Sequence, residues 1–223
     1  MGAMRLAWPS SWPGNPVACI EMVRSDAQSD SRVGFAADID TKQHPMALKS
    51  TVFKADLQVS DMDRHYYQGH PLTIAQHPSE TDERMMVRVL AFALNADESL
   101  VFGKGLSSED EPDLWRKELT GEVDLWIELG QPDEQRIRRA AGRANRVIVY
   151  TYSGRGAEVW WKKMASAVAR TKNVTVIDVA PATVAALAAL TQRTMQIQFM
   201  VQDGQAQVIS GDTVVPIELT TLS

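Results

Sequence analysis

The stretch Val123-Asp124-Leu125-Trp126-Ile127-Glu128-Leu129-Gly130 decides the fold class, because it alternates in the way a half-buried strand does. Its odd positions carry Val, Leu, Ile and Leu, and its even positions carry Asp, Trp, Glu and Gly. Successive side chains of a strand point to opposite faces of the sheet. The pattern therefore predicts a strand with one face in the core and Glu128 on the other face.

The residues before this strand predict an antiparallel neighbour. A two-residue loop at Thr120-Gly121 would set Asp113 opposite Glu128 and Trp115 opposite Trp126. The same register would set Lys117 opposite Asp124. Directly opposed side chains have Cβ atoms about 5 Å apart, a separation that one divalent cation can bridge between two carboxylates. The spacing predicts a shared metal site at Asp113 and Glu128.

Two interpretations of residues 109–117 remain open. In the hairpin register, Arg116 and Glu118 would fall on the core face, which only a bulge or a longer loop could avoid. Alternatively, Ser108 and the acidic residues after it have the chemistry of a helix start, which would make 109–117 a short helix. The metal site depends on the hairpin.

A helix is expected before this region. Ser79-Glu80-Thr81-Asp82 forms a capping box, and the apolar pattern continues to about Ala96. Glu83 shares a helix face with Met86 and Leu90, so we expect it to be partly buried and to need a partner. A metal or the polar face of the sheet could provide that partner, although acids in a first turn also simply favour the helix dipole. Glu83 is our third candidate site residue.

The rest of the pattern predicts one α/β domain with a mixed sheet that antiparallel strands extend from both ends. Parallel strands are expected at 123–129, 146–151 and 174–179, with helices at about 132–143, 157–170 and 182–192. Further strands are expected at 50–59, 195–202, 205–210 and 213–219. Asp203-Gly204 predicts a hairpin turn, and Pro216 predicts an edge strand.

Several runs of residues resemble the YaeQ family of bacterial proteins, from Met46 to the C-terminus. They are His77-Pro78-Ser79-Glu80-Thr81, Glu83-Arg84-Met85-Met86, Asp124-Leu125-Trp126-Ile127-Glu128-Leu129-Gly130, Pro132-Asp133-Glu134 and Arg193-Thr194-Met195. The resemblance implies a variant of the PD-(D/E)XK restriction-endonuclease-like fold, with no established activity. Pro112-Asp113 and the acid at the end of the later strand are similar to that superfamily's metal-binding motif.

The superfamily pattern asks for a lysine two residues after the acid, where this chain has Gly130. Gln131 could orient a water molecule there but supplies no charge, which Lys117, Arg136 or Arg155 could supply from elsewhere. The resemblance implies a nuclease-like site that cleaves a phosphodiester with Mg²⁺ or Mn²⁺, using Asp113, Glu128, Glu83 and Gln131. The alternative is a catalytically inactive module that binds protein or nucleic acid.

Composition sets the remaining expectations. The 223 residues are 44% hydrophobic with a net charge of −5, so any attraction to nucleic acid must be local. No apolar run is long enough to cross a membrane, and the single cysteine, Cys19, suits a reducing compartment, so we expect a cytoplasmic protein. Residues 1–45 lack sustained patterning and are expected to be an extension outside the native fold, with residues 46–223 forming a single domain.

Overall fold

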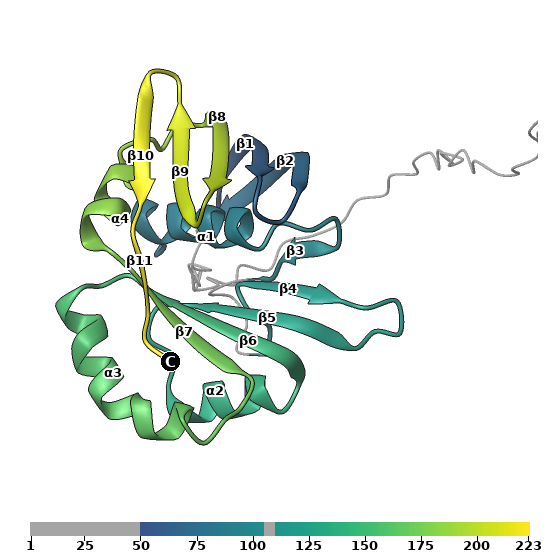
Figure 1. Ribbon diagram of the computed structural model, residues 1–223, viewed down its shortest axis with the longest axis vertical. Helices are drawn as coiled ribbons and strands as arrows, with labels where there is room; N and C mark the ends of the chain where they lie inside the picture. The colour runs from purple at the N-terminus through teal and green to yellow at the C-terminus, as the bar shows by residue number, and fades with distance from the viewer. Residues whose placement is uncertain (1–49, 105–109) are drawn as a thin grey trace, which may run out of the picture. The chain divides into compact units, whose positions relative to one another are not determined.

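A computed structural model describes residues 50–104 and 110–223, all within the unit Met46–Ser223. The expectations for residues 1–45 and for Ser108 lie outside these ranges. In the described residues, two sheets and four helices follow one another along the chain (Figure 1). The α/β class predicted from the sequence is confirmed.

Sheet A contains strands from both ends of the described chain. Its order is β10-β9-β8-β1-β2, with β1 at Thr51–Asp61, β2 at Tyr66–Gln76, β8 at Thr194–Gln202, β9 at Gln205–Ser210 and β10 at Thr213–Ile217. The Asp203-Gly204 turn joins β8 to β9 as predicted, with positive φ at both residues. β10 carries Pro216 and is an edge strand, also as predicted.

Sheet B contains the predicted parallel strands. Its order is β11-β7-β6-β5-β4-β3, with β3 at Leu100–Phe102, β4 at Leu114–Lys117, β5 at Val123–Leu129, β6 at Ala144–Thr151, β7 at Val174–Val179 and β11 at Leu219–Thr221. Strands β5, β6 and β7 pair in parallel. The helices α2 (Glu134–Ala141) and α3 (Arg155–Val168) connect them.

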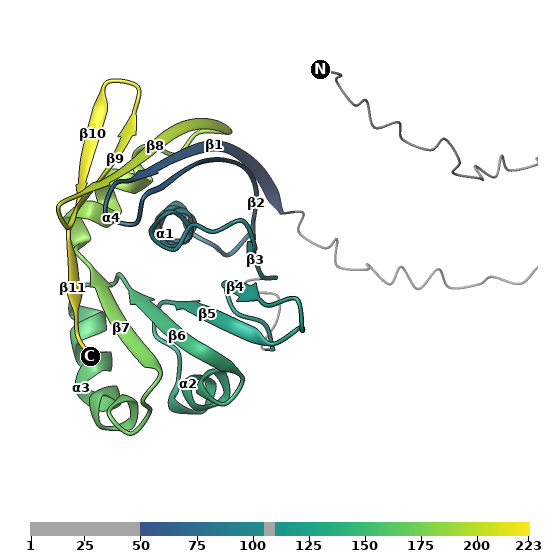
Figure 2. The ribbon, with the colours of Figure 1, turned by 45° about the vertical axis from the view of Figure 1, so that its right-hand side comes forward.

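Helix α1 (Asp82–Leu94) lies between the two sheets (Figure 2). Thr81 caps its first turn by accepting a hydrogen bond from the Arg84 amide, and every residue from Met85 to Ala93 is buried. Its apolar cluster includes residues of both sheets and of α4 (Pro181–Ala188). A second cluster joins the opposite face of sheet B to α2 and α3. Sheet B is therefore covered on both faces, as parallel sheets usually are.

The expectation of one extended mixed sheet needs correction. The terminal strands form a separate sheet, apart from β11, which pairs with β7. The physical reason is α1, which is buried all round and so needs apolar surface on two sides. A helix with one apolar stripe would have been satisfied by a single sheet.

The hairpin interpretation is confirmed and the short helix is wrong over 114–117, which form β4. Leu114 pairs with Ile127, and Trp115 pairs with Trp126, as predicted. The register then shifts at a bulge after Arg116, so Lys117 lies opposite Val123 and not opposite Asp124. The turn is also longer than two residues, since the Glu118 amide donates to the Glu122 carbonyl.

None of the helices in the described ranges is long and apolar enough to cross a membrane.

Candidate functional site

Asp113 sits directly before β4, at the end of the β4–β5 pair where β5 finishes. Its amide donates to the carbonyl of Ile127, and its Oδ2 accepts from the amide of Leu129 at 2.8 Å. Its Oδ1 accepts from Nη2 of Arg84 in α1 at 2.6 Å. The side chain is 3% exposed. Backbone and helix therefore hold this buried carboxylate from two sides.

Glu128 is the last acid of β5 and is equally buried. Its Oε1 accepts from the indole Nε1 of Trp126 at 2.7 Å and from Nε of Arg136 in α2 at 2.9 Å. Burial raises the pKa of this carboxyl group, and the negative charge of Asp113 raises it further. The hydrogen bonds from Arg136 and Trp126 oppose that rise. Asp113 and Glu128 therefore share one electrostatic environment.

A third buried carboxylate, Glu80, precedes α1. Its Oε2 accepts from Nη2 of Arg88 at 3.0 Å and from the amide of His77 at 3.3 Å. Burial raises the pKa of Glu80 despite the attraction of Arg88, and the charge of Asp113 also raises it. Glu80 thus belongs to the same group of buried charges as Asp113.

Glu83 does not take the place expected for it. Its side chain is exposed, so the expectation of partial burial is wrong. Helix α1 turns the neighbouring Arg84 toward Asp113 instead. Glu80, which we had treated as a capping residue, is the buried acid of this segment.

Gln131 lies just beyond β5 and is exposed. Its Nε2 donates to Oγ of Ser153 at 2.7 Å, which joins the segment after β5 to the segment after β6. Gly156, in the first turn of α3, is close to the same amide, because a Cβ there would lie 2.9 Å from Nε2 of Gln131. The amide is therefore held at the end of sheet B where Glu128 lies.

Gly130 has a backbone conformation that favours glycine. Its φ is +94°, and its amide donates to the carbonyl of Tyr150. An L-residue with a Cβ is strained at this φ whatever space surrounds it. A lysine at this position, as the superfamily pattern has it, would need a different backbone.

The arrangement is charge-neutralised, because arginines face the carboxylates: Arg88 faces Glu80, Arg84 faces Asp113 and Arg136 faces Glu128. The described residues contain no group of three or more His, Cys, Asp or Glu side chains that could hold a metal ion. Two carboxylates nevertheless suit Mg²⁺, which usually takes one or two of them and fills its shell with water and substrate phosphate. A metal at Asp113 and Glu128 would have to displace Arg84 and Arg136.

Arg84 and Arg88 are the residues of this site that sequence reasoning missed, whereas Arg136 was among the candidates for the missing positive charge. Arg84 and Arg88 are one helical turn apart, a spacing that the sequence does show. Two arginines on a helix whose face is otherwise apolar must find buried acids, and that signal could have pointed to Asp113 and Glu80.

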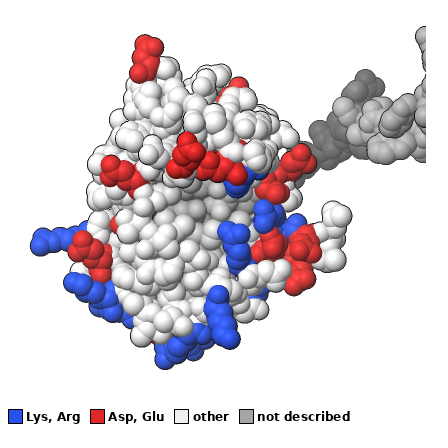
Figure 3. Space-filling view, viewed as in Figure 1, with Lys and Arg blue, Asp and Glu red and all other residues white. Residues whose placement is uncertain are grey.

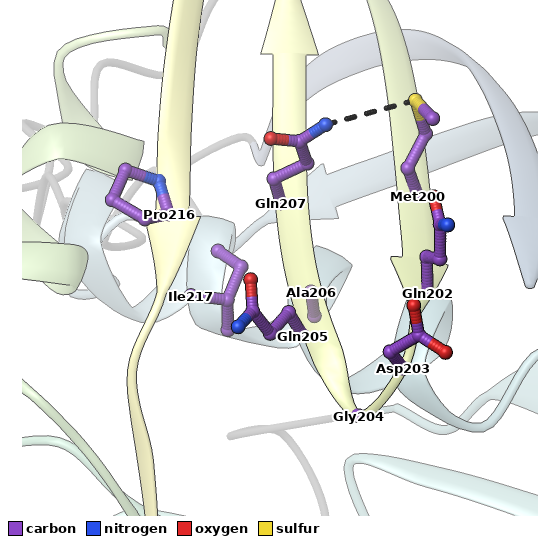
Figure 4. Close-up of a pocket in the computed structure, with 9 residues that line it drawn as sticks. All are labelled: Met200, Gln202, Asp203, Gly204, Gln205, Ala206, Gln207, Pro216 and Ile217. Atoms are coloured by element: carbon purple, nitrogen blue, oxygen red, sulfur yellow. Dashed lines mark hydrogen bonds between the residues drawn. The ribbon is translucent and has the colours of Figure 1, made fainter.

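A cavity of about 570 Å³ lies elsewhere, lined by the β8–β9 turn and its flanking residues and by the end of β10 (Figure 4). Met200, Asp203 and Gln207 are among the residues that line it, and Gln207 donates a hydrogen bond to the Met200 sulfur. The lining contains a single ionisable side chain, Asp203. It offers no paired acid, base or nucleophile, so the buried carboxylates are the stronger candidate site.

The chain matches known proteins over nearly all of its described length. The sequence model of the family described as YaeQ protein matches residues 46–219. The uncharacterized protein YaeQ of Salmonella typhi is 43% identical over 175 residues, which are 78% of this chain and 97% of that protein. Its namesake in Escherichia coli strain K12 is 44% identical over 159 residues, or 71% and 88% of the two chains.

Solved structures agree with this relationship. The crystal structure of the YaeQ protein from Xanthomonas axonopodis pv. citri has a TM-score of 0.75 at 52% identity, covering 78% of this chain and 98% of that one. The YaeQ protein from Pseudomonas syringae has a TM-score of 0.75 at 38% identity, covering 78% and 96%. The chain therefore belongs to the YaeQ family.

Proposed function

We propose that this protein acts on a nucleic-acid phosphodiester through a divalent-metal site at Asp113 and Glu128, as a variant of the PD-(D/E)XK nucleases. The observation that supports it most is the burial of these two carboxylates at one end of the β4–β5 pair, each 3% exposed. Burial also raises the pKa of Glu128, and buried groups with a perturbed pKa are more frequent at functional sites than elsewhere. Oxygen ligands of this kind suit Mg²⁺ or Mn²⁺.

The arginines give the proposed site a closed state and an open state. In the free protein, Arg84 and Arg136 hold Asp113 and Glu128 at 2.6 and 2.9 Å. Asp113 and Glu128 would hold a divalent ion in place of these two arginine contacts, and the ion would supply a bound water of lowered pKa. The released guanidinium groups could then donate paired N–H hydrogen bonds to phosphate oxygens. Phosphate and metal would accordingly bind together better than either alone.

Gln131 has the second role in this proposal. Its amide is held by Ser153 beside the end of β5, and it can orient a water molecule by hydrogen bonding. It supplies no positive charge, so Arg84 and Arg136 take over the electrostatic role that the superfamily lysine plays. Glu83 is exposed and is not needed by this scheme.

One observation favours the second candidate, a module that binds without catalysis. Asp113, Glu128 and Glu80 all have an arginine partner, and such pairs also occur for purely structural reasons. In that case the buried charges fix the position of α1 and α2 against sheet B, and they never meet a metal.

Metal-dependent melting separates the two candidates. If Asp113 and Glu128 bind Mg²⁺ or Mn²⁺, the ion stabilises the domain by about 2.7 kcal/mol at a hundredfold excess over Kd. Glu128→Ala and Asp113→Asn should abolish that rise. Asp124→Asn is the matched control, since Asp124 is on the same strand but about 13 Å from Glu128 and pairs with Arg116.

Cleavage assays complete the test. Stabilisation by metal together with metal-dependent cleavage of DNA or RNA, lost in Glu128→Ala and kept in Asp124→Asn, supports the enzyme. Stabilisation without cleavage leaves a metal-binding, inactive fold. The absence of stabilisation in either ion, well above millimolar concentration, eliminates the metal site and leaves the binding module.

A further inference from the structure

Positive charge is concentrated in one segment of this acidic protein. Residues 134–172 contain ten Lys or Arg and two Asp or Glu, a formal net charge of +8 in a chain of −5. The other described residues contain eight Lys or Arg and twenty Asp or Glu, a net charge of −12. The segment covers α2, β6 and α3. Such a segregation creates a local field that the net charge conceals.

The fold places this charge on one side of sheet B. α2 and α3 both pack on the same face of the sheet, in the cluster that contains Trp126, Ile137 and Trp160. Most of their large apolar residues, such as Ile137, Trp160 and Met164, face inward, and the exposed faces carry the basic residues together with Val159. In Figure 3, Lys and Arg gather along the lower left and lower edge, where Figure 1 places α3 and α2, while Asp and Glu predominate above. The exposed basic residues on this side are Arg138, Arg143, Arg155, Lys162, Lys163, Arg170 and Lys172, which we call the α2–α3 basic surface. Arg146 of β6 is also exposed, but it shares the opposite face of the sheet with Ile148 and Tyr150 and is not part of this surface.

A groove of about 410 Å³ runs between the two helices within this surface. Arg138 and Arg170 stand on its walls and share one acid, Glu134, at 2.5 and 3.4 Å. Both arginines are about 70% exposed. Since one carboxylate cannot neutralise two guanidinium groups, the groove keeps a net positive charge.

We propose that the α2–α3 basic surface binds the phosphate backbone of a nucleic acid duplex. Seven exposed cations, spread over α2, α3 and the segments that follow these helices, suit a ligand with regularly repeated negative charge. A membrane surface is disfavoured, because membrane-binding helices present a row of large apolar side chains outward, whereas Val159 of α3 is the single large apolar side chain that α2 and α3 expose. The acidic remainder of the domain repels the same duplex and so orients it onto this surface.

The inference rests on the proposed function for its choice of partner, and it extends that function by assigning the surface that holds the nucleic acid. Arg136 connects the two sites, because it lies on α2 and pairs with Glu128. Binding at the basic surface needs no metal, so the two proposals fail in different experiments.

The test is a titration of a fluorescent DNA duplex and an RNA duplex, each of about 20 base pairs, with the full chain in EDTA at a series of salt concentrations. We expect binding at about 50 mM salt that weakens as salt rises, with a slope of about −0.9 in log K against log salt for each phosphate contact. Lys162→Gln/Lys163→Gln should weaken binding at least about tenfold and reduce the slope by about two contacts. Arg143→Gln/Lys172→Gln, which leaves the residues that line the groove intact, should do the same.

The matched control is Lys54→Gln/Arg193→Gln, which removes two exposed charges from sheet A. It should bind within about twofold of the wild type, and thermal melting should show that all variants fold. Equal weakening in this control, no binding at low salt, or tighter binding to phosphatidylserine vesicles than to either duplex would overturn the proposal. Glu128→Ala should keep duplex binding, so a failure of the metal site leaves this result unaffected.

Discussion

Gly130 stands at the position where the proposed PD-(D/E)XK pattern would have a lysine. Its φ of +94° shows that the difference is one of backbone as well as side chain. The Gly130 amide donates to the Tyr150 carbonyl, next to Glu128 and Leu129 in β5. The positive charges that contact Asp113 and Glu128 come from other elements, namely Arg84 of α1 and Arg136 of α2.

Gly130→Ala tests this backbone requirement. We expect it to lower the free energy of unfolding by about 1–2 kcal/mol, the cost of a Cβ in the left-handed region. Gly142→Ala is the control, because Gly142 has a φ of −82° at the end of α2, where a Cβ would make ordinary contacts. Urea unfolding measures both. Equal effects of the two substitutions would contradict a conformational role for Gly130.

The raised pKa of Glu128 fixes the sign of its contribution to the pH dependence of stability. Burial raises this pKa in the folded protein above its unfolded value. As the pH falls through the folded pKa, the folded state takes up the proton before the unfolded chain does, so stability rises. The gain is complete below the unfolded pKa, and it is lost again as the pH rises through the folded pKa.

Glu128→Gln removes that proton uptake. The free energy of unfolding of the wild type, minus that of Glu128→Gln, should therefore increase from neutral pH down to the unfolded carboxyl pKa, near 4.3. Glu83→Gln, which also removes one carboxylate but from the exposed side of α1, controls for the lost charge. A difference that stays flat with pH would show that Glu128 is not desolvated in solution.

At the scale of elements, α1 combines a wholly buried body with two arginines. Nη2 of Arg88 donates to Glu80 and to the carbonyl of Ala75 in β2, so it joins the helix to the edge of sheet A. Burial raises the pKa of Glu80 and lowers that of Arg88, even though the two attract each other. Desolvation thus outweighs the attraction for both groups.

This balance predicts opposite outcomes for single and double substitutions. Arg88→Met leaves Glu80 buried without its partner and should destabilise the domain by about 3–5 kcal/mol. Glu80→Leu/Arg88→Met removes both charges and should recover most of that loss. Chemical denaturation of the two single variants, the double variant and the wild type measures the coupling. Additive losses would contradict a desolvated pair.

Elements with a clear period were predictable, and those shaped by packing were not. β5 and β8 lie where their alternation placed them, and the Asp203-Gly204 turn follows from its residues. β2 was missed because Gly69 and Pro71 interrupt its pattern, which an edge strand tolerates. The separate sheet A was missed because only the complete burial of α1 requires it.

The candidate site also has a part that the sequence predicts and a part that depends on packing. The positions of Asp113 and Glu128 follow from strand pairing, which is local and periodic. Their arginine partners come from two helices on opposite faces of sheet B, and Arg84 is 29 residues from Asp113. Such contacts depend on how the layers pack, and a single sequence gives no distance between layers.

At the scale of the whole molecule, the described domain has two sheets and one shared core between them. The larger apolar cluster contains Leu57 of sheet A, Leu90 of α1 and Ile127 of sheet B. Helix α1 covers the inner face of both sheets. If one sheet unfolded, α1 would be exposed to water on that side, and the inner face of the other sheet would lose part of its packing. We therefore expect the domain to unfold as a single cooperative unit.

Tryptophan fluorescence can test this cooperativity, because all four Trp residues of the described ranges, Trp115, Trp126, Trp160 and Trp161, lie in sheet B or in α3. With Trp8 and Trp12 replaced by Phe, fluorescence reports on this half, and far-ultraviolet circular dichroism reports on both sheets. Leu57→Ala, in the centre of sheet A at 0% exposure, should cost about 2–5 kcal/mol. Both signals should move to the same lower denaturant midpoint. If the fluorescence midpoint stayed in place while the circular dichroism midpoint fell, sheet A would unfold separately and α1 would not couple the two sheets.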